Sequence, residues 1–127
     1  MGCILLHHTQ LNWTASRQYC QEQESRLIEI LTEPQMMFIA NILSEKKNEP
    51  DPVAGWWTGA SDVDREGTWS WTVNKNQTVG EYIWASELGE PNGGSRENYL
   101  ALWRGYHYKG MDAGDWGLDM HALCQRM

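Results

Sequence analysis

A proline-containing break near the middle of the 127-residue chain separates two stretches of different character. In the segment Glu49-Pro50-Asp51-Pro52 two residues lack a backbone amide donor, so this segment is expected to be a loop. Before the break, apolar residues recur at helical spacing, and after it short aromatic runs are separated by turn residues. Helices followed by a group of strands predict an α+β domain.

The first stretch predicts two helices. One runs from about Trp13 to Glu24, with Asn12 or Thr14 as its N-cap. The other begins with Thr32 and Gln35, which have the spacing of a capping box. Its apolar side chains then repeat at helical spacing in Met36, Ile39, Ile42 and Leu43.

The second stretch predicts a small antiparallel β region. Its short aromatic segments are expected to be strands, at residues 56–60, 68–72, 81–84 and 99–103. Residues 85–98 between the last two are rich in Gly, Pro, Asn and Ser. A loop of that length inside a compact domain is usually functional.

Length and charge narrow the classes of function. The chain is long enough for a single domain, residues 1–127, with its own core. Its net charge of −7 argues against nucleic acid as a partner. No apolar run approaches the ~20 residues of a membrane span. The three cysteines contain no CxxC pair, and the sequons at Asn12 and Asn76 favour a secreted, extracellular protein.

The long loop holds a cluster of oxygen-bearing side chains. Glu90-Pro91-Asn92 is followed closely by Glu97-Asn98. Calcium takes six to eight oxygen ligands from carboxylates, amides and water, so this cluster is a plausible partial shell for Ca²⁺. The alternative is an ordinary surface loop, because such loops are rich in the same residues.

The order of motifs along the chain resembles the C-type lectin family over nearly its full length. Trp57-Thr58-Gly59-Ala60 corresponds to that family's Trp-Ile-Gly-Leu core motif. The remaining motifs, in order, are Trp13-x-Ala15-x4-Cys20, Trp69-x-Trp71, Trp84, Glu90-Pro91-Asn92, Glu97-Asn98-Tyr99-Leu100 and Leu123-Cys124. The resemblance implies a C-type lectin-like fold, with two helices flanking small antiparallel sheets and a long loop that binds calcium and sugar.

The resemblance also implies a ligand set. Glu90, Asn92 and Glu97 would be metal ligands that also bond the sugar, with a cis Glu90–Pro91 peptide bond. The Glu-Pro-Asn order resembles members that take mannose, GlcNAc or fucose, whereas Gln-Pro-Asp goes with galactose. The family's Trp-Asn-Asp motif is replaced by Met111-Asp112-Ala113. Asp112 would then bind both metal and sugar, and Ala113 would offer its carbonyl; a small shift in register would use Asp115 instead.

The cysteines match the family in part. Cys20 and Cys124 correspond to its outer disulfide. Cys3 would be a free thiol or an intermolecular bridge that could join copies of the chain into a homo-oligomer. The inner disulfide is missing, and Tyr99 and Trp116 are expected to pack in its place.

The sequence also offers candidates for a second calcium site and for aromatic contacts with a sugar. Asp62 and Glu66, with Asn98, match a second calcium site of some relatives, and the alternative is an acidic turn. The segment after the predicted 99–103 strand could stack exposed rings on a sugar, or else pack in a core or a dimer, through Trp103, Tyr106, His107 and Tyr108. His7 and His8 are expected on a first strand.

The sequence therefore predicts calcium-dependent carbohydrate binding in innate immune or cell-surface glycan recognition. The alternative is a lectin-like domain that binds a protein without calcium or sugar. An enzyme is not expected, because a calcium shell accounts for Glu90 and Glu97, the acids that a glycosidase would need.

Overall fold

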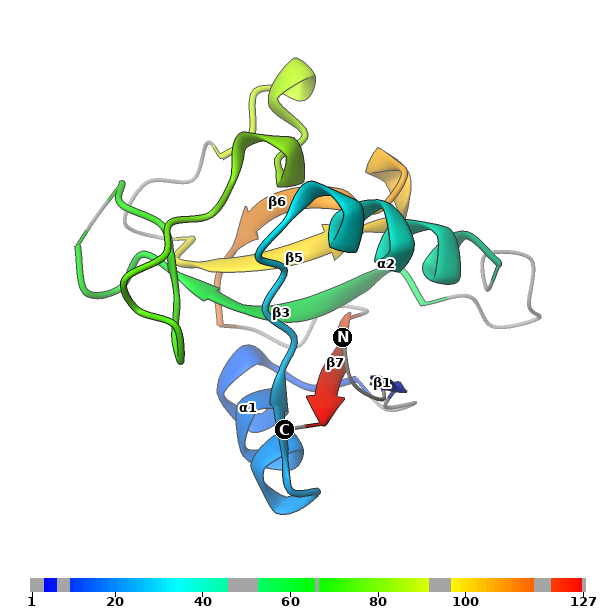
Figure 1. Ribbon diagram of the computed structural model, residues 1–127, viewed down its shortest axis with the longest axis vertical. Helices are drawn as coiled ribbons and strands as arrows, with labels where there is room; N and C mark the ends of the chain where they lie inside the picture. The colour runs from blue at the N-terminus through cyan, green and yellow to red at the C-terminus, as the bar shows by residue number, and fades with distance from the viewer. Residues whose placement is uncertain are drawn as a thin grey trace.

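Twelve short elements follow one another along the computed structural model, which describes residues 4–6, 10–45, 53–65, 67–91, 97–115 and 120–126 (Figure 1). The predictions made for Cys3, His7, His8, Glu66, Asn92 and Trp116, and for the loop at residues 49–52, concern residues outside these ranges. The elements are β1 (Ile4–Leu6), α1 (Trp13–Glu22), β2 (Ser25–Leu27), α2 (Glu33–Glu45), β3 (Gly55–Ser61), β4 (Ser70–Trp71), η1 (Glu81–Ile83), η2 (Ser86–Leu88), β5 (Tyr99–Trp103), η4 (Arg104–Tyr106), β6 (Lys109–Ala113) and β7 (Met120–Arg126).

Both predicted helices are present, and local hydrogen bonds explain where they begin. Asn12 is the cap of α1, since its Oδ1 accepts a hydrogen bond from the Ala15 amide at 2.8 Å. The helix ends at Glu22, slightly earlier than predicted, and Glu24 has a φ of 56°, which is incompatible with continuing the helix. At α2 the capping box is confirmed: the Gln35 amide donates to Thr32 Oγ1 at 3.3 Å, and the Thr32 amide donates to Gln35 Oε1 at 3.2 Å.

The strands form a mixed sheet in the order β1-β7-β3-β5-β6, with β2 paired to β7 and β4 paired to β3. The expectation of purely antiparallel pairing is wrong at one place, because β3 and β7 are parallel. These two strands are far apart in sequence, so no tight hairpin dictates their relative direction. In Figure 1, β3, β5 and β6 form one part of the molecule, with α2 beside them, and α1 lies near β7 and both chain ends.

Only some of the aromatic segments that were predicted as strands form strands. Segments 56–60 and 99–103 are confirmed as β3 and β5, and segment 68–72 contributes only the two-residue strand β4. Segment 81–84 is wrong: residues 81–83 form the 3-10 turn η1, and Trp84 makes only an isolated bridge to Gly110. The sequence pattern did not predict β2 or β7. These strands pair with each other next to the disulfide, with Leu27 opposite Cys124.

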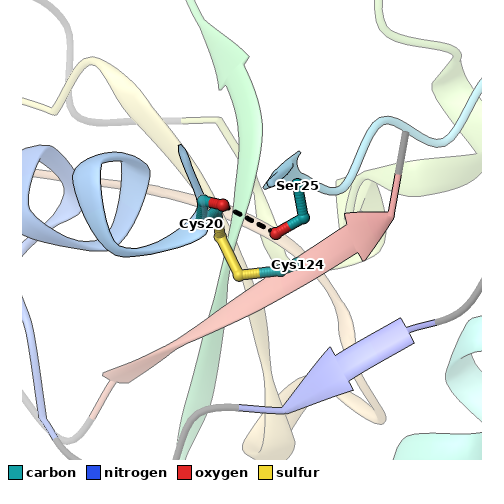
Figure 2. The surroundings of a disulfide bond; sticks show 3 residues. All are labelled: Cys20, Ser25 and Cys124. Atoms are coloured by element: carbon teal, nitrogen blue, oxygen red, sulfur yellow. Dashed lines mark hydrogen bonds between the residues drawn. A yellow bond between two sulfur atoms is a disulfide. The ribbon is translucent and has the colours of Figure 1, made fainter. Parts of the chain in front are cut away.

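Tryptophan fills the core of this molecule. Six of the seven tryptophans within the described residues are buried: Trp13, Trp56, Trp57, Trp69, Trp71 and Trp84. One cluster lies under α2, around Ile39, Leu43 and Trp71. The other surrounds the Cys20–Cys124 disulfide, which joins α1 to β7 as the resemblance implied (Figure 2). Among the described helices, none is long and apolar enough to cross a membrane.

Candidate functional site

Backbone hydrogen bonds hold the residue before η2 against β6 and fold the residues after η2 back onto it. The Ala85 amide donates to the Gly110 carbonyl at 2.9 Å, and the Glu90 amide donates back to the Ala85 carbonyl at 3.3 Å. Gly110 permits this approach, because a Cβ there would lie 3.1 Å from the Ile83 carbonyl oxygen. The Glu90–Pro91 peptide bond is cis, as the family resemblance implied. This arrangement brings Glu90 beside Asp112 on β6.

Glu90 and Asp112 meet at this point. The Asp112 amide donates a hydrogen bond to Glu90 Oε1 at 3.4 Å. Tyr106, in the turn η4, donates its hydroxyl to Glu90 Oε2 at 3.4 Å. Both acids are largely buried, with 8% of Glu90 and 3% of Asp112 exposed. Two predicted ligands from separate segments are therefore in direct contact.

The electrostatics of this pair follow from burial and like charge. Burial raises the pKa of the Glu90 carboxyl to about 7, and the hydrogen bond and negative charge of Asp112 add to the effect, followed by the charge of Glu97. The pKa of Glu97 is also raised, first by burial and then by Asp112. The three acids are thus close enough to oppose one another's ionisation. A divalent cation would relieve that repulsion.

The described residues do not by themselves make up a metal site. Among them, no three His, Cys, Asp or Glu side chains form a group that could hold a metal ion. The Glu90–Asp112 pair would need further oxygens, from Glu97 and from loop residues such as Asn92. Carboxylate and amide oxygens suit calcium, and the absence of His and Cys from this set disfavours zinc.

Asp115, the alternative ligand, contacts the first turn of α1 and not Glu90. Its Oδ1 accepts a hydrogen bond from the Thr14 amide at 3.0 Å, and its Oδ2 accepts one from the Thr14 hydroxyl. An acid at the first turn of α1 also interacts favourably with the helix dipole. Ala113, between the two acids, is buried and pairs with Tyr99 on β5. Asp112 is therefore the acid that β6 presents to the loop.

The candidates for a second ion site come together in part. The Asp62 amide donates to the Asn98 carbonyl at 3.1 Å, and Asp62 Oδ2 accepts from the Gly67 amide at 3.0 Å. Asp62 is 2% exposed, and its Oδ1 makes no hydrogen bond within the described residues. The hydrogen bond from Gly67 to Asp62 Oδ2 is expected of an acidic turn. Asp62 Oδ1 remains as an oxygen that a cation could bind.

The predicted aromatic platform is only partly available. Tyr108 is 2% exposed and belongs to the core under α2, so the expectation that it stacks on a sugar is wrong. It has a φ of 63° and closes the turn after β5, where its amide donates to the Trp103 carbonyl. Trp103 is half-buried and His107 is exposed. The Tyr106 hydroxyl donates to Glu90.

Tyr99 packs against α1, whereas its expected contact with Trp116 concerns a residue outside the described ranges and stays a prediction. Its ring stacks on Trp13, with centroids 4.2 Å apart and an angle of 21° between the planes. This contact joins the start of β5 to α1. The pairing could not be read from the sequence, because Trp13 is remote along the chain.

Comparison with known proteins agrees with this fold. The family model of the lectin C-type domain matches residues 9–116. The gorilla protein "C-type lectin domain family 4 member M" is 29% identical over 98 residues, which cover 76% of this chain and 24% of that protein. The chain thus spans about a quarter of that relative's length.

Two solved structures are similar over almost the whole chain. TC14, a C-type lectin from the tunicate Polyandrocarpa misakiensis, has a TM-score of 0.80 at 17% identity and covers 98% of this chain and 97% of its own. The carbohydrate-recognition domain of cow CD23, crystallised in the presence of GlcNAc2Man3 oligosaccharide, has a TM-score of 0.77 at 25% identity and covers 98% of this chain and 87% of its own. The chain therefore belongs to the C-type lectin domain family.

Proposed function

We propose that this domain binds calcium at the Glu90–Asp112 site and, through it, a carbohydrate of the mannose, GlcNAc or fucose type. The observation that carries the proposal is the contact between these two acids, one from the Glu-Pro-Asn loop and one from β6. Holding two largely buried carboxyl groups together is unfavourable when both are ionised. A site built this way gains stability from a bound cation.

Each residue has a proposed role. Glu90, Asn92, Glu97 and Asp112 would supply side-chain oxygens, and Ala113 would add its carbonyl. Bound calcium would supply the coordination positions that two neighbouring sugar hydroxyls occupy. Glu90 and Glu97 would accept hydrogen bonds from those hydroxyls, whereas the amide of Asn92 would donate one. This order of donors and acceptors would select the hydroxyl geometry, and the oligosaccharide used with cow CD23 contains mannose and GlcNAc.

The setting of the domain is consistent with recognition outside the cell. The Cys20–Cys124 bridge is stable in an oxidising compartment. We propose that the domain is extracellular and recognises glycans, as a part of innate immune or cell-surface recognition. Single lectin sites bind weakly, so useful avidity would come from several copies acting together.

A glycan array tests this proposal. Fluorescently labelled domain should bind mannose-, GlcNAc- or fucose-terminated glycans in about 2 mM calcium. This concentration exceeds the dissociation constants of extracellular calcium modules, which reach on the order of 1 mM. Binding should disappear in EDTA and return when calcium is restored. Binding to no glycan in either buffer, together with unchanged thermal stability on addition of calcium, would favour the protein-binding alternative.

A further inference from the structure

A second pocket lies away from the Glu90–Asp112 site. It is a cavity of about 240 Å³ between α1, the end of β3, β4 and the start of β5. None of the proposed calcium ligands of the loop or of β6 lines it. Its volume is below the ~300–1,000 Å³ of pockets for drug-sized ligands, so a single ring is the size that fits.

The aromatic side of this pocket is fixed before any ligand arrives. Trp13 and Tyr99 are stacked, and the Trp13 indole N–H donates to the Thr58 carbonyl at 2.8 Å. Trp71, which also lines the pocket, is 1% exposed. Rings held in one orientation lose little conformational freedom when a ligand packs on them. Tyr99 is the most accessible of the three, being half-buried.

Two cations line the same pocket. The Arg17 guanidinium carbon lies 5.8 Å from the centroid of the Trp13 ring. Burial and the charge of Asp115 raise the pKa of the Tyr99 hydroxyl, and the positive charge of Arg17 partly offsets this by lowering it. Lys75 lines the pocket from the loop after β4. Within the described residues neither cation forms an ion pair. Asp64 is the one acid among the lining residues, whose charges sum to about +1, and Asp115 acts on Tyr99 from outside the lining.

The rest of the lining is hydroxylated. Ser61, Ser70 and Thr72 provide side-chain hydroxyls that can both donate and accept hydrogen bonds. A ligand that uses the whole lining would combine a ring with one apolar face, several hydroxyl groups and a negative charge. Acidic monosaccharides have all three properties.

We propose that this pocket binds an acidic sugar residue, with its ring against Tyr99 and its carboxylate or sulfate group between Arg17 and Lys75. The pocket would act without calcium and would read a different feature of a glycan from the loop site. Guanidinium groups suit both anions, because they donate parallel hydrogen bonds to carboxylate and to oxyanions of sulfur or phosphorus.

Nuclear magnetic resonance of the ¹⁵N-labelled domain in EDTA tests the proposal. Glucuronate, glucose 6-sulfate, neutral glucose and inorganic sulfate would each be titrated while the assigned indole N–H signals of Trp13 and Trp71 are followed. At least one of the two acidic sugars should shift both indole signals in a saturable manner. Comparing the affinity for glucuronate with that for glucose 6-sulfate distinguishes carboxylate from sulfate recognition. Arg17→Gln and Lys75→Gln should each weaken binding about tenfold, the loss expected for a charge-assisted hydrogen bond.

Lys109→Gln is the matched control, since Lys109 is exposed and pairs with Trp103 at the end of β5 opposite to Tyr99. It should leave the affinity unchanged. The proposal is overturned if neither acidic sugar shifts the two signals, or if neutral glucose or inorganic sulfate does so equally well. Equal affinities for wild type and both pocket variants would also overturn it. Because the titration is done in EDTA, its failure is separate from failure of the calcium site.

Discussion

Glu90 holds its carboxyl group against Asp112, and this contact makes the calcium-free domain sensitive to pH. The pKa of Glu90 is raised from an ordinary 4.5 to about 7, so between these values the folded chain binds more protons than the unfolded chain at this group. The stability that Glu90 contributes is therefore fully present below about pH 4.5 and is lost as the pH rises through 7. The proposed calcium binding would have the opposite pH dependence, because a metal ligand must be deprotonated.

This predicts a pH-dependent difference between wild type and Glu90→Gln. In EDTA, the melting temperature of wild type minus that of Glu90→Gln should decrease from pH 5 to pH 8 in differential scanning calorimetry. Glu87→Gln, at an exposed position on η2, should show no such trend relative to wild type. A constant difference for Glu90→Gln across this range would mean that the Glu90 pKa is close to its ordinary value.

The sugar preference is a second prediction at the residue scale. Glu90→Gln combined with Asn92→Asp should shift the preference from mannose towards galactose, because the exchange reverses which side chain donates to the sugar hydroxyls. Competition by the two monosaccharides for an immobilised glycan, in calcium, measures the ratio. Retention of mannose-type selectivity by the double variant would contradict the hydroxyl-geometry argument.

Among the elements, the loop after β4 depends on one buried acid. Glu29, which follows β2, is 1% exposed and accepts hydrogen bonds from the Val73 amide at 2.7 Å and from the Asn74 amide and side-chain amide at 3.1 and 2.7 Å. A carboxylate has the acceptor capacity for all three donors, whereas a carboxamide presents one oxygen and a competing donor. This acid therefore attaches the loop that carries Lys75 to the core.

Glu29→Gln should lower the free energy of unfolding by about 2–3 kcal/mol, the range for a hydrogen bond to a charged group whose partners stay buried. Urea denaturation followed by tryptophan fluorescence measures the change. Glu87→Gln again serves as the exposed control and should change stability by less than about 0.5 kcal/mol. Equal midpoints for the two variants would show that the loop has other anchors.

The element boundaries show which parts of the fold were accessible from sequence. Strong local signals worked: the Thr32–Gln35 box and the Asn12 cap begin α2 and α1 as expected. Segment 81–84 failed because Tyr82, Ile83 and Trp84 have high strand propensity, while backbone hydrogen bonds from Ile83 to Gly80 and from Trp84 to Glu81 close a tight turn instead. Propensity for a pleated surface is not evidence that a neighbouring strand is present.

For the whole molecule, the order of motifs predicted more than any single segment did. It implied the Cys20–Cys124 bridge and the cis Glu90–Pro91 bond, and both are present. Contacts between remote residues were not accessible in this way. The Tyr99–Trp13 stack, the Asp115–Thr14 hydrogen bonds and the burial of Tyr108 depend on tertiary packing, for which a single sequence has no local signal.

The Asp115–Thr14 contact makes Asp115 a matched control for Asp112. Asp112 and Asp115 both follow the Glu-Pro-Asn loop in sequence and carry the same charge, yet one contacts Glu90 and the other contacts the first turn of α1. Replacing each acid by alanine removes the same charge from two different places. The pair of variants therefore separates a ligand role from a general effect of acidity.

Isothermal titration of calcium into wild type, Asp112→Ala and Asp115→Ala is the most direct measurement. Wild type and Asp115→Ala should bind calcium with affinities within about threefold of each other, and Asp112→Ala should bind at least about tenfold more weakly, with a parallel loss of mannose binding. Circular dichroism of the three proteins would confirm that each is folded. Equal affinities for wild type and Asp112→Ala, or a loss of binding in Asp115→Ala alone, would contradict the assignment of the calcium site to Glu90 and Asp112.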